Sequence, residues 1–86
     1  MNSRLADSTE REIRRLCSEY PKHKDLIDDA LDESLDAGVK RPMLEDLALG
    51  RGYAKTSIYF MSEVSYKREK HRAKICIAQR FGLPIN

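Results

Sequence analysis

The chain has 86 residues, of which 41% are hydrophobic and 35% charged, and its formal net charge at pH 7 is +2. This length and composition argue against disorder and against several domains, and they favour one small helical domain over residues 1–86. The sequence has no apolar run long enough to cross a membrane and no apolar secretion signal at its start, so we expect a cytoplasmic protein with no membrane partner.

The first predicted helix begins near Thr9 and carries one apolar stripe. The stripe has the helical spacing i, i+3, i+4, i+7 and consists of Ile13, Leu16, Cys17 and Tyr20. Thr9 and Glu12 have the spacing of a capping box at the start of this helix. Pro21 is expected to end it.

A second predicted helix has the same spacing, with acidic residues on its other face. Its apolar positions are Leu26, Ile27, Ala30, Leu31 and Leu35. We interpret the carboxylates between residues 25 and 36 as a solvated face rather than a divalent-ion site, because EF-hand spacing and its loop glycine are absent. Gly38 is expected to close the helix in a left-handed conformation, with Val39 packing back.

Residues 44–61, LEDLALGRGYAKTSIYFM, have the spacing of two helices that cross at a tight turn. Pro42 fits the first turn of the first of these helices, Ala48 is small enough for a close crossing, and Gly50 and Gly52 would end the helix, with Gly52 at positive φ. The seam between the helices would consist of Leu47, Tyr53, Ile58 and Met61. This segment resembles the helix-turn-helix of bacterial and phage repressors. We therefore expect an all-α, compact bundle of four to five helices containing a helix-turn-helix at about residues 43–64.

From Lys55 the pattern predicts helix as far as Phe81, with two alternatives for its middle. In one, a single long helix leaves its polar middle in solvent or on a phosphate backbone. In the other, which we favour, the chain bends near His71 and a fifth helix docks on the core, because the later apolar residues would otherwise lack a partner within one monomer. Residues 77–83 resemble the front half of a second helix-turn-helix, but a helix end at Gly82, followed by Leu83 and Pro84, explains them better.

The charges are distributed unevenly along the chain. Up to Val39 there are 6 Lys or Arg against 10 Asp or Glu, whereas from Lys40 onward there are 10 against 4. This asymmetry suggests that the basic half meets a polyanion. The alternative is the solvated face of a long surface helix, formed by Lys67, Arg68, Lys70, Arg72 and Lys74.

The resemblance to repressors implies a sequence-specific regulator of transcription that binds double-stranded DNA as a homodimer. The predicted DNA-contact residues are Arg51, Lys55, Thr56, Tyr59, Phe60, Glu63, Lys67, Arg68, Lys70 and Arg72. Lysine would meet phosphate or guanine, threonine and phenylalanine a thymine methyl, and glutamate a cytosine amine. The alternative is a helical adaptor or inhibitor that binds a protein partner through the acidic second helix or exposed aromatic residues. An RNA-binding factor is a third interpretation, disfavoured because the chain lacks the modules that read single strands.

Catalytic and metal-binding patterns are weak in this sequence. Cys17, His23, His71 and Cys76 supply the ligand types of a zinc site, but they lack the usual close cysteine pair and both cysteines lie on apolar stripes. No phosphate-binding glycine loop and no nucleophile beside a base is recognisable. We therefore predict no enzyme, no cofactor and no metal, and cysteines that stay as thiols.

Overall fold

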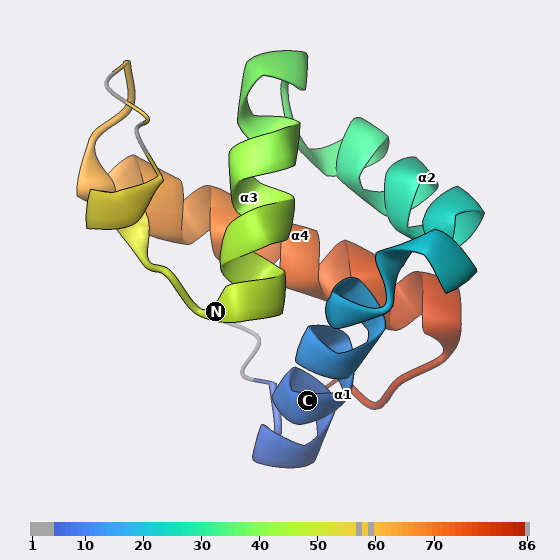
Figure 1. Ribbon diagram of the computed structural model, residues 1–86. Coiled ribbons are helices and arrows are strands. Elements are labelled where there is room, and N and C mark those ends of the chain that lie inside the picture. The colour runs from blue at the N-terminus through green and yellow to red at the C-terminus, as the bar shows by residue number, and fades with distance from the viewer. Residues whose placement is uncertain (1–4, 57, 59, 86) are drawn as a thin grey trace.

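The structure is a computed structural model that describes residues 5–56, 58 and 60–85. Within this part of the chain all regular elements are helical, as predicted, and they form one compact body of 32 × 32 × 21 Å. The helices are α1 (Asp7–Ser18), α2 (Lys24–Ser34), α3 (Ala37–Leu49) and α4 (Glu63–Phe81), with short 3₁₀ helices at Tyr20–Lys22 and Tyr53–Lys55. The most extensive packing is between α2 and α4 and between α1 and α3, and α4 passes behind α3 and α1 in Figure 1.

The apolar stripes predicted for the first two helices form much of the core. Those of α1 and α2 bury Ile13, Leu16, Cys17, Ile27, Ala30 and Leu31. The predicted end of the first helix before Pro21 is also confirmed, because α1 stops at Ser18 and Pro21 lies in the 3₁₀ helix Tyr20–Lys22. Leu26 is the exception, since it is 42% exposed.

The predicted capping box of α1 is wrong. The helix begins at Asp7, and no side chain caps its first turn. Thr9 is instead buried, and its hydroxyl donates a hydrogen bond of 2.9 Å to the carbonyl of Pro84. This tertiary contact takes the place of the local one because the segment after α4 packs against the start of α1.

The boundary between the second and third helices also differs from the prediction. Gly38 does not close α2; it lies in the first turn of α3, and Leu35 and Asp36 form the extended link before it. Pro42 therefore lies inside α3 rather than in its first turn. Val39 is buried, and this burial, together with the Val39 N–H donating to the Asp36 carbonyl at 3.0 Å, accounts for the earlier start.

The third helix ends as predicted, but the fourth begins later. Gly50 follows Leu49 in a left-handed conformation, and Gly52 has a φ of 79°. The predicted start of the next helix at Lys55 is wrong, because α4 begins at Glu63 and residues 50–62 connect it to α3. Ser62 provides the N-cap: its hydroxyl accepts a hydrogen bond from the Ser65 N–H at 3.2 Å.

The predicted bend near His71 is wrong as well, because α4 is continuous from Glu63 to Phe81. Tyr66, Ala73 and Ile77 are buried along its length, so the helix finds its partners within the monomer. Its predicted end at Gly82 is confirmed: Gly82 has a φ of 68°, and the Leu83 N–H donates to the Ala78 carbonyl at 2.8 Å.

Candidate functional site

The basic residues of α4 lie in three different environments. Lys67, Lys70 and Lys74 are spaced i, i+3 and i+7, and the last two line a groove against α1. Arg72 lies at a separate cleft formed with the acidic end of α2. Arg68 is exposed to solvent. The cations of α4 therefore do not form one continuous basic surface.

The exposed cations of α4 are only loosely held by carboxylates of the same helix. Lys67, whose side chain is 70% exposed, lies 3.1 Å from Glu63, and Arg72, 58% exposed, lies 3.6 Å from Glu69. Ion pairs of this kind between exposed side chains contribute only a few tenths of a kcal/mol. Both cations are thus available to an external anion.

The predicted contact residues before α4 do not share one helical face. Thr56 was predicted to contact DNA, but it is only 9% exposed and its hydroxyl donates to the Tyr53 carbonyl at 2.7 Å. Lys55 is exposed, and Arg51 is exposed beside Glu45 at 3.6 Å. Phe60 is 69% exposed. Tyr59 lies outside the described residues, so its predicted role stays a prediction.

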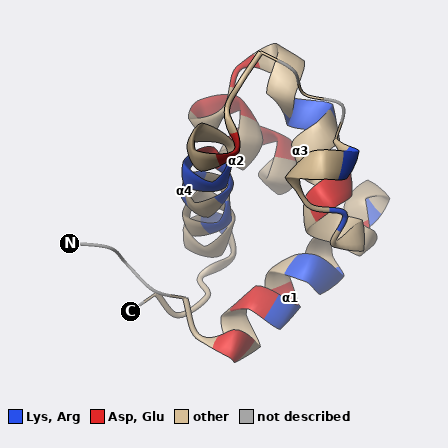
Figure 2. Cartoon of the chain, turned by 90° about the vertical axis from the view of Figure 1, so that its left-hand side faces the viewer, with Lys and Arg blue, Asp and Glu red and all other residues tan. Residues whose placement is uncertain are grey.

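Folding brings the acidic and basic halves of the sequence together. Lys40 lies 2.8 Å from Asp32 and 3.4 Å from Asp28, and Lys74 and Arg80 of α4 pair with Glu10 and Glu33. Figure 2 shows basic positions on α4 next to acidic positions on α2. The asymmetry along the sequence is therefore partly neutralised in space.

A basic groove runs between α1, the C-terminal end of α3 and the middle of α4, with a volume of about 250 Å³. Four cationic side chains line it, two from each of the outer helices: Arg11, Arg14, Lys70 and Lys74. Two carboxylates, Glu10 and Asp46, also line it. We call this surface the α1–α4 groove.

Asp46 forms the floor of the α1–α4 groove, and its side chain is fully buried. One carboxylate oxygen accepts the Gly52 N–H at 2.8 Å, and the other accepts the Tyr66 hydroxyl at 2.5 Å and lies 3.0 Å from the Lys70 ammonium. Burial alone would raise the pKa of Asp46, but these three partners outweigh it and lower the pKa below its usual value. Burial and the bond to Asp46 raise the pKa of Tyr66.

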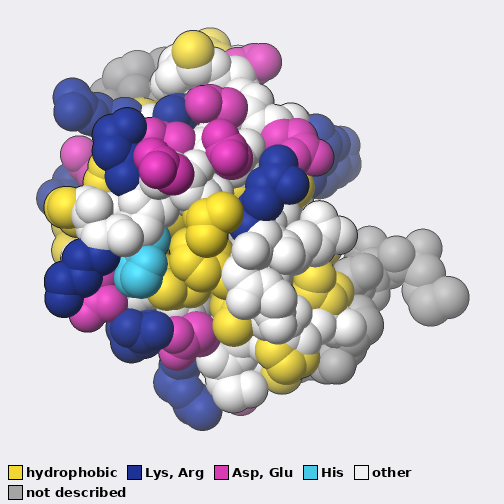
Figure 3. Space-filling model, turned by 90° about the vertical axis from the view of Figure 1, so that its right-hand side faces the viewer, with side chains coloured by type: hydrophobic (Ala, Val, Ile, Leu, Met, Phe, Trp, Pro, Cys, Tyr) yellow, Lys and Arg dark blue, Asp and Glu magenta, His cyan; other side chains and the backbone are white. Residues whose placement is uncertain are grey.

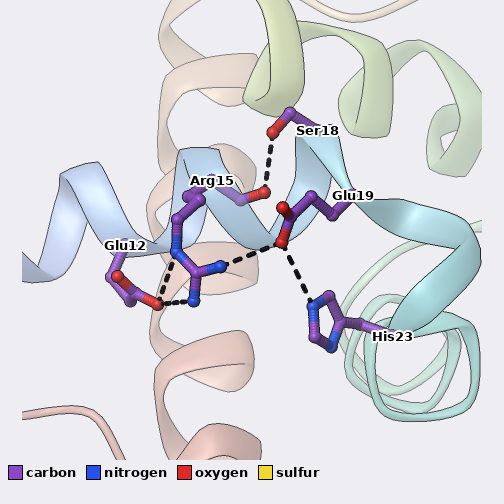
Figure 4. Close-up of polar contacts among 5 residues, drawn as sticks. All are labelled: Glu12, Arg15, Ser18, Glu19 and His23. Carbon is purple, nitrogen blue, oxygen red and sulfur yellow. Dashed lines mark hydrogen bonds and ion pairs between the residues drawn. The ribbon is translucent and has the colours of Figure 1, made fainter.

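The arginines of α1 differ in whether a carboxylate pairs with them. Arg15 is engaged on the surface between Glu12 and Glu19, and Glu19 in turn lies 3.6 Å from the His23 imidazole, as Figure 4 shows. Arg11 and Arg14 have no ion-pair partner among the residues that the structure describes. They are the unneutralised cations of the α1–α4 groove.

The four candidate zinc ligands do not assemble. No group of three or more His, Cys, Asp or Glu side chains suited to a metal ion occurs among residues 5–56, 58 and 60–85. Cys17 is buried, and burial raises the pKa of its thiol to about 12, so it stays protonated at neutral pH. The His23 ring packs edge-on against Phe81.

Acid should destabilise the fold through Asp28. Hydrogen bonds from Lys24 and Tyr20, at 2.8 and 2.5 Å, lower its pKa from 3.8 to about 2. A lowered folded-state pKa stabilises the protein above pH 3.8, and this contribution disappears as the pH falls from about 4 towards 2. We expect Asp28→Asn to remove about 1 kcal/mol of stability at pH 6 and to flatten the acid limb of the profile.

Urea unfolding followed by circular dichroism between pH 2 and 6 measures this effect. The control is Asp29→Asn, because Asp29 is exposed on the same helix and has no ion pair among the described residues. Equal profiles for the two variants would show that the Asp28 cluster does not carry the acid sensitivity.

The face shown in Figure 3 has a different character from the α1–α4 groove. Asp and Glu gather towards the top of the view, above an exposed hydrophobic area beside a histidine.

No helix in the described part of the chain is both long and apolar enough to span a membrane. Comparison with known protein families, curated protein sequences and solved structures finds no match for this chain.

Proposed function

We propose that this protein is a small double-stranded-DNA-binding protein that contacts the phosphate backbone through the exposed cations of α4. The observation that carries the proposal is that α4 is one continuous helix from Glu63 to Phe81 with a solvent-facing cationic middle. Lys67, Arg68 and Arg72 are all exposed there. Cations on the outside of a helix can exchange weak intramolecular pairs for phosphates, and the release of counterions favours that exchange.

The finer part of the proposal is a sequence-specific transcriptional regulator of bacterial, phage or plasmid type that acts as a homodimer. Because α4 begins at Glu63, base reading would fall to its first turns rather than to residues 55–62. The exposed side chains there include Glu63, Val64, Lys67 and Arg68. Competition between a selected duplex and random duplex tests this finer claim.

DNA binding is tested by fluorescence anisotropy with a labelled random duplex at several salt concentrations. We expect a Kd on the order of 10⁻⁴ to 10⁻⁶ M at physiological salt and a steep loss of affinity as salt rises. A variant with Lys67→Gln, Arg68→Gln and Arg72→Gln should reduce the slope of log K against log salt by up to about three. Lys70 is left unchanged because it holds buried Asp46.

The matched control removes the same charge elsewhere, with Arg15→Gln, Lys22→Gln and Arg41→Gln, none of which lies on α4. This control should keep most of the wild-type slope. An absence of binding at 50 mM salt, or an equal loss in both variants, would contradict the proposal.

One observation favours a second candidate function, a protein-binding adaptor. Phe60 and Val64 are both strongly exposed apolar side chains near the start of α4. Exposed aromatic and aliphatic residues often mark protein interfaces. If Phe60→Ser with Val64→Ser abolishes capture of a co-purifying protein while DNA binding is absent from the wild type, the adaptor is the better interpretation.

A further inference from the structure

We infer that the α1–α4 groove is a binding site for a phosphate group, with Arg11 and Arg14 as its main contacts. The site goes beyond the proposed function because it lies on the α1 side of α4 and uses residues from the acidic half of the sequence. The phosphate can belong to a nucleic-acid backbone or to a free phosphorylated compound, and the experiment below separates these sources.

The charges in the groove are arranged to leave two cations for a ligand. Both carboxylates are already engaged, Glu10 by Lys74 and Asp46 by Lys70, so neither neutralises the arginines. Arg11 and Arg14 are exposed, one helical turn apart, and unpaired within the part of the chain described. A guanidinium group presents a planar fork of N–H donors that matches phosphate oxygens.

Asp46 is the feature that most opposes an anion in this groove. Its carboxylate has no exposure to solvent, and its two oxygens are occupied by three donors. Lys70 supplies a compensating positive charge at 3.0 Å, on the groove side. The lining as a whole therefore remains net positive by two charges, with four cations against two carboxylates.

The guanidinium of Arg14 lies against the backbone of Gly50, the residue that follows α3. A Cβ atom built on Gly50 would lie 1.8 Å from an Arg14 guanidinium nitrogen, so the guanidinium lies directly over this glycine. The apolar side chains of Ile13 and Leu47 line the groove nearby. A guanidinium held against such a wall loses less freedom on binding an anion than one that extends freely into solvent.

The first arm of the test titrates the full chain with pyrophosphate and follows backbone amide shifts by NMR. We expect saturable shifts at Arg11, Arg14 and Gly50, and no comparable response to acetate, which carries a single charge. Arg11→Gln with Arg14→Gln should weaken pyrophosphate binding by about tenfold or more. Arg11→Lys with Arg14→Lys should give an intermediate loss, because the charge stays and the fork is lost.

The control variant Arg15→Gln with Lys22→Gln removes the same charge and should bind pyrophosphate as the wild type does. Thermal melts verify that each variant is folded. Shifts spread over all surface cations, or an equal loss in the control, would overturn the inference.

The second arm measures duplex DNA with the Arg11/Arg14 glutamine variant. A salt slope reduced by up to about two, together with lost pyrophosphate binding, identifies a backbone phosphate as the ligand. Lost pyrophosphate binding with unchanged DNA binding identifies a free phosphorylated compound. If the wild type binds pyrophosphate in the groove but no DNA, the proposed function fails and the phosphate site stands.

Discussion

Asp46→Ala is expected to lower the free energy of unfolding by about 3 kcal/mol. The change leaves the Gly52 N–H and the buried Tyr66 hydroxyl without their acceptor, and it leaves the partly buried Lys70 ammonium without its counter-ion. For a domain of this size, whose total stability is about 4 to 13 kcal/mol, that is a large share. Chemical denaturation followed by circular dichroism measures it.

Two milder changes separate the contribution of the Tyr66 hydrogen bond from that of the Asp46 charge. Tyr66→Phe removes one donor and keeps the carboxylate paired with Lys70, so we expect a loss of about 1 kcal/mol. Asp46→Asn keeps the shape and one acceptor oxygen but removes the charge. Its loss of unfolding free energy should fall between those of Asp46→Ala and Tyr66→Phe. If the free energy of unfolding of Asp46→Ala lies within about 0.5 kcal/mol of the wild-type value, the buried network does not stabilise the fold.

Gly52→Val should lower the free energy of unfolding by about 2 kcal/mol. Gly52 has φ 79° and ψ 168°, a region of backbone conformation that is nearly restricted to glycine. A Cβ atom there would have no neighbour within 4 Å, so the cost comes from the backbone rather than from a clash.

Gly38→Ala is the matched control for Gly52→Val. Gly38 is helical, and an added Cβ would meet only the Phe60 ring, at 3.9 Å. Because alanine favours helix over glycine, the melting temperature should stay the same or rise. If Gly52→Val has the same melting temperature as Gly38→Ala, the connection 50–62 adapts to a side chain at position 52.

The helical architecture and most of the core of α1 and α2 could be predicted from periodicity alone. Their apolar residues recur at helical spacing, and one buried face is enough to explain residues such as Ile13 and Leu31. The glycine-capped ends of α3 and α4 were also predictable, because a left-handed cap has a local sequence signature.

The beginning of α4 was mispredicted because two signals conflicted. Residues 55–61 contain apolar positions at helical spacing, whereas the cap that starts the helix is Ser62. Tyr66 follows the predicted apolar positions, and its partner Asp46 lies 20 positions away, so no local pattern reveals that it is buried. This hydrogen bond accompanies the burial of Tyr66, which with buried Ala73 and Ile77 gives the continuous helix partners along its length.

The α1–α4 groove was missed for a related reason. Arg11 and Arg14 belong to the half of the sequence with excess negative charge, so the charge count along the sequence predicts no basic surface there. The local spacing on α1 gives no signal either, because Arg11 has Asp7 and Arg14 has Glu10 four residues before it, positions that favour ion pairs on a helix. Among the described residues neither of these pairs forms, since Glu10 pairs with Lys74 instead, so only the tertiary structure reveals the two arginines as unpaired.

The pairing of α1 with α3 and of α2 with α4 has a consequence for the way this chain folds. Neighbouring helices in the sequence are not each other's main partners, so no consecutive pair can fold as an independent hairpin. Stable contacts form only after a loop of at least one intervening helix has closed, which costs entropy before it returns any packing energy. Hydrogen exchange in the centres of all four helices should therefore proceed through one global opening, with a single protection free energy shared across the molecule.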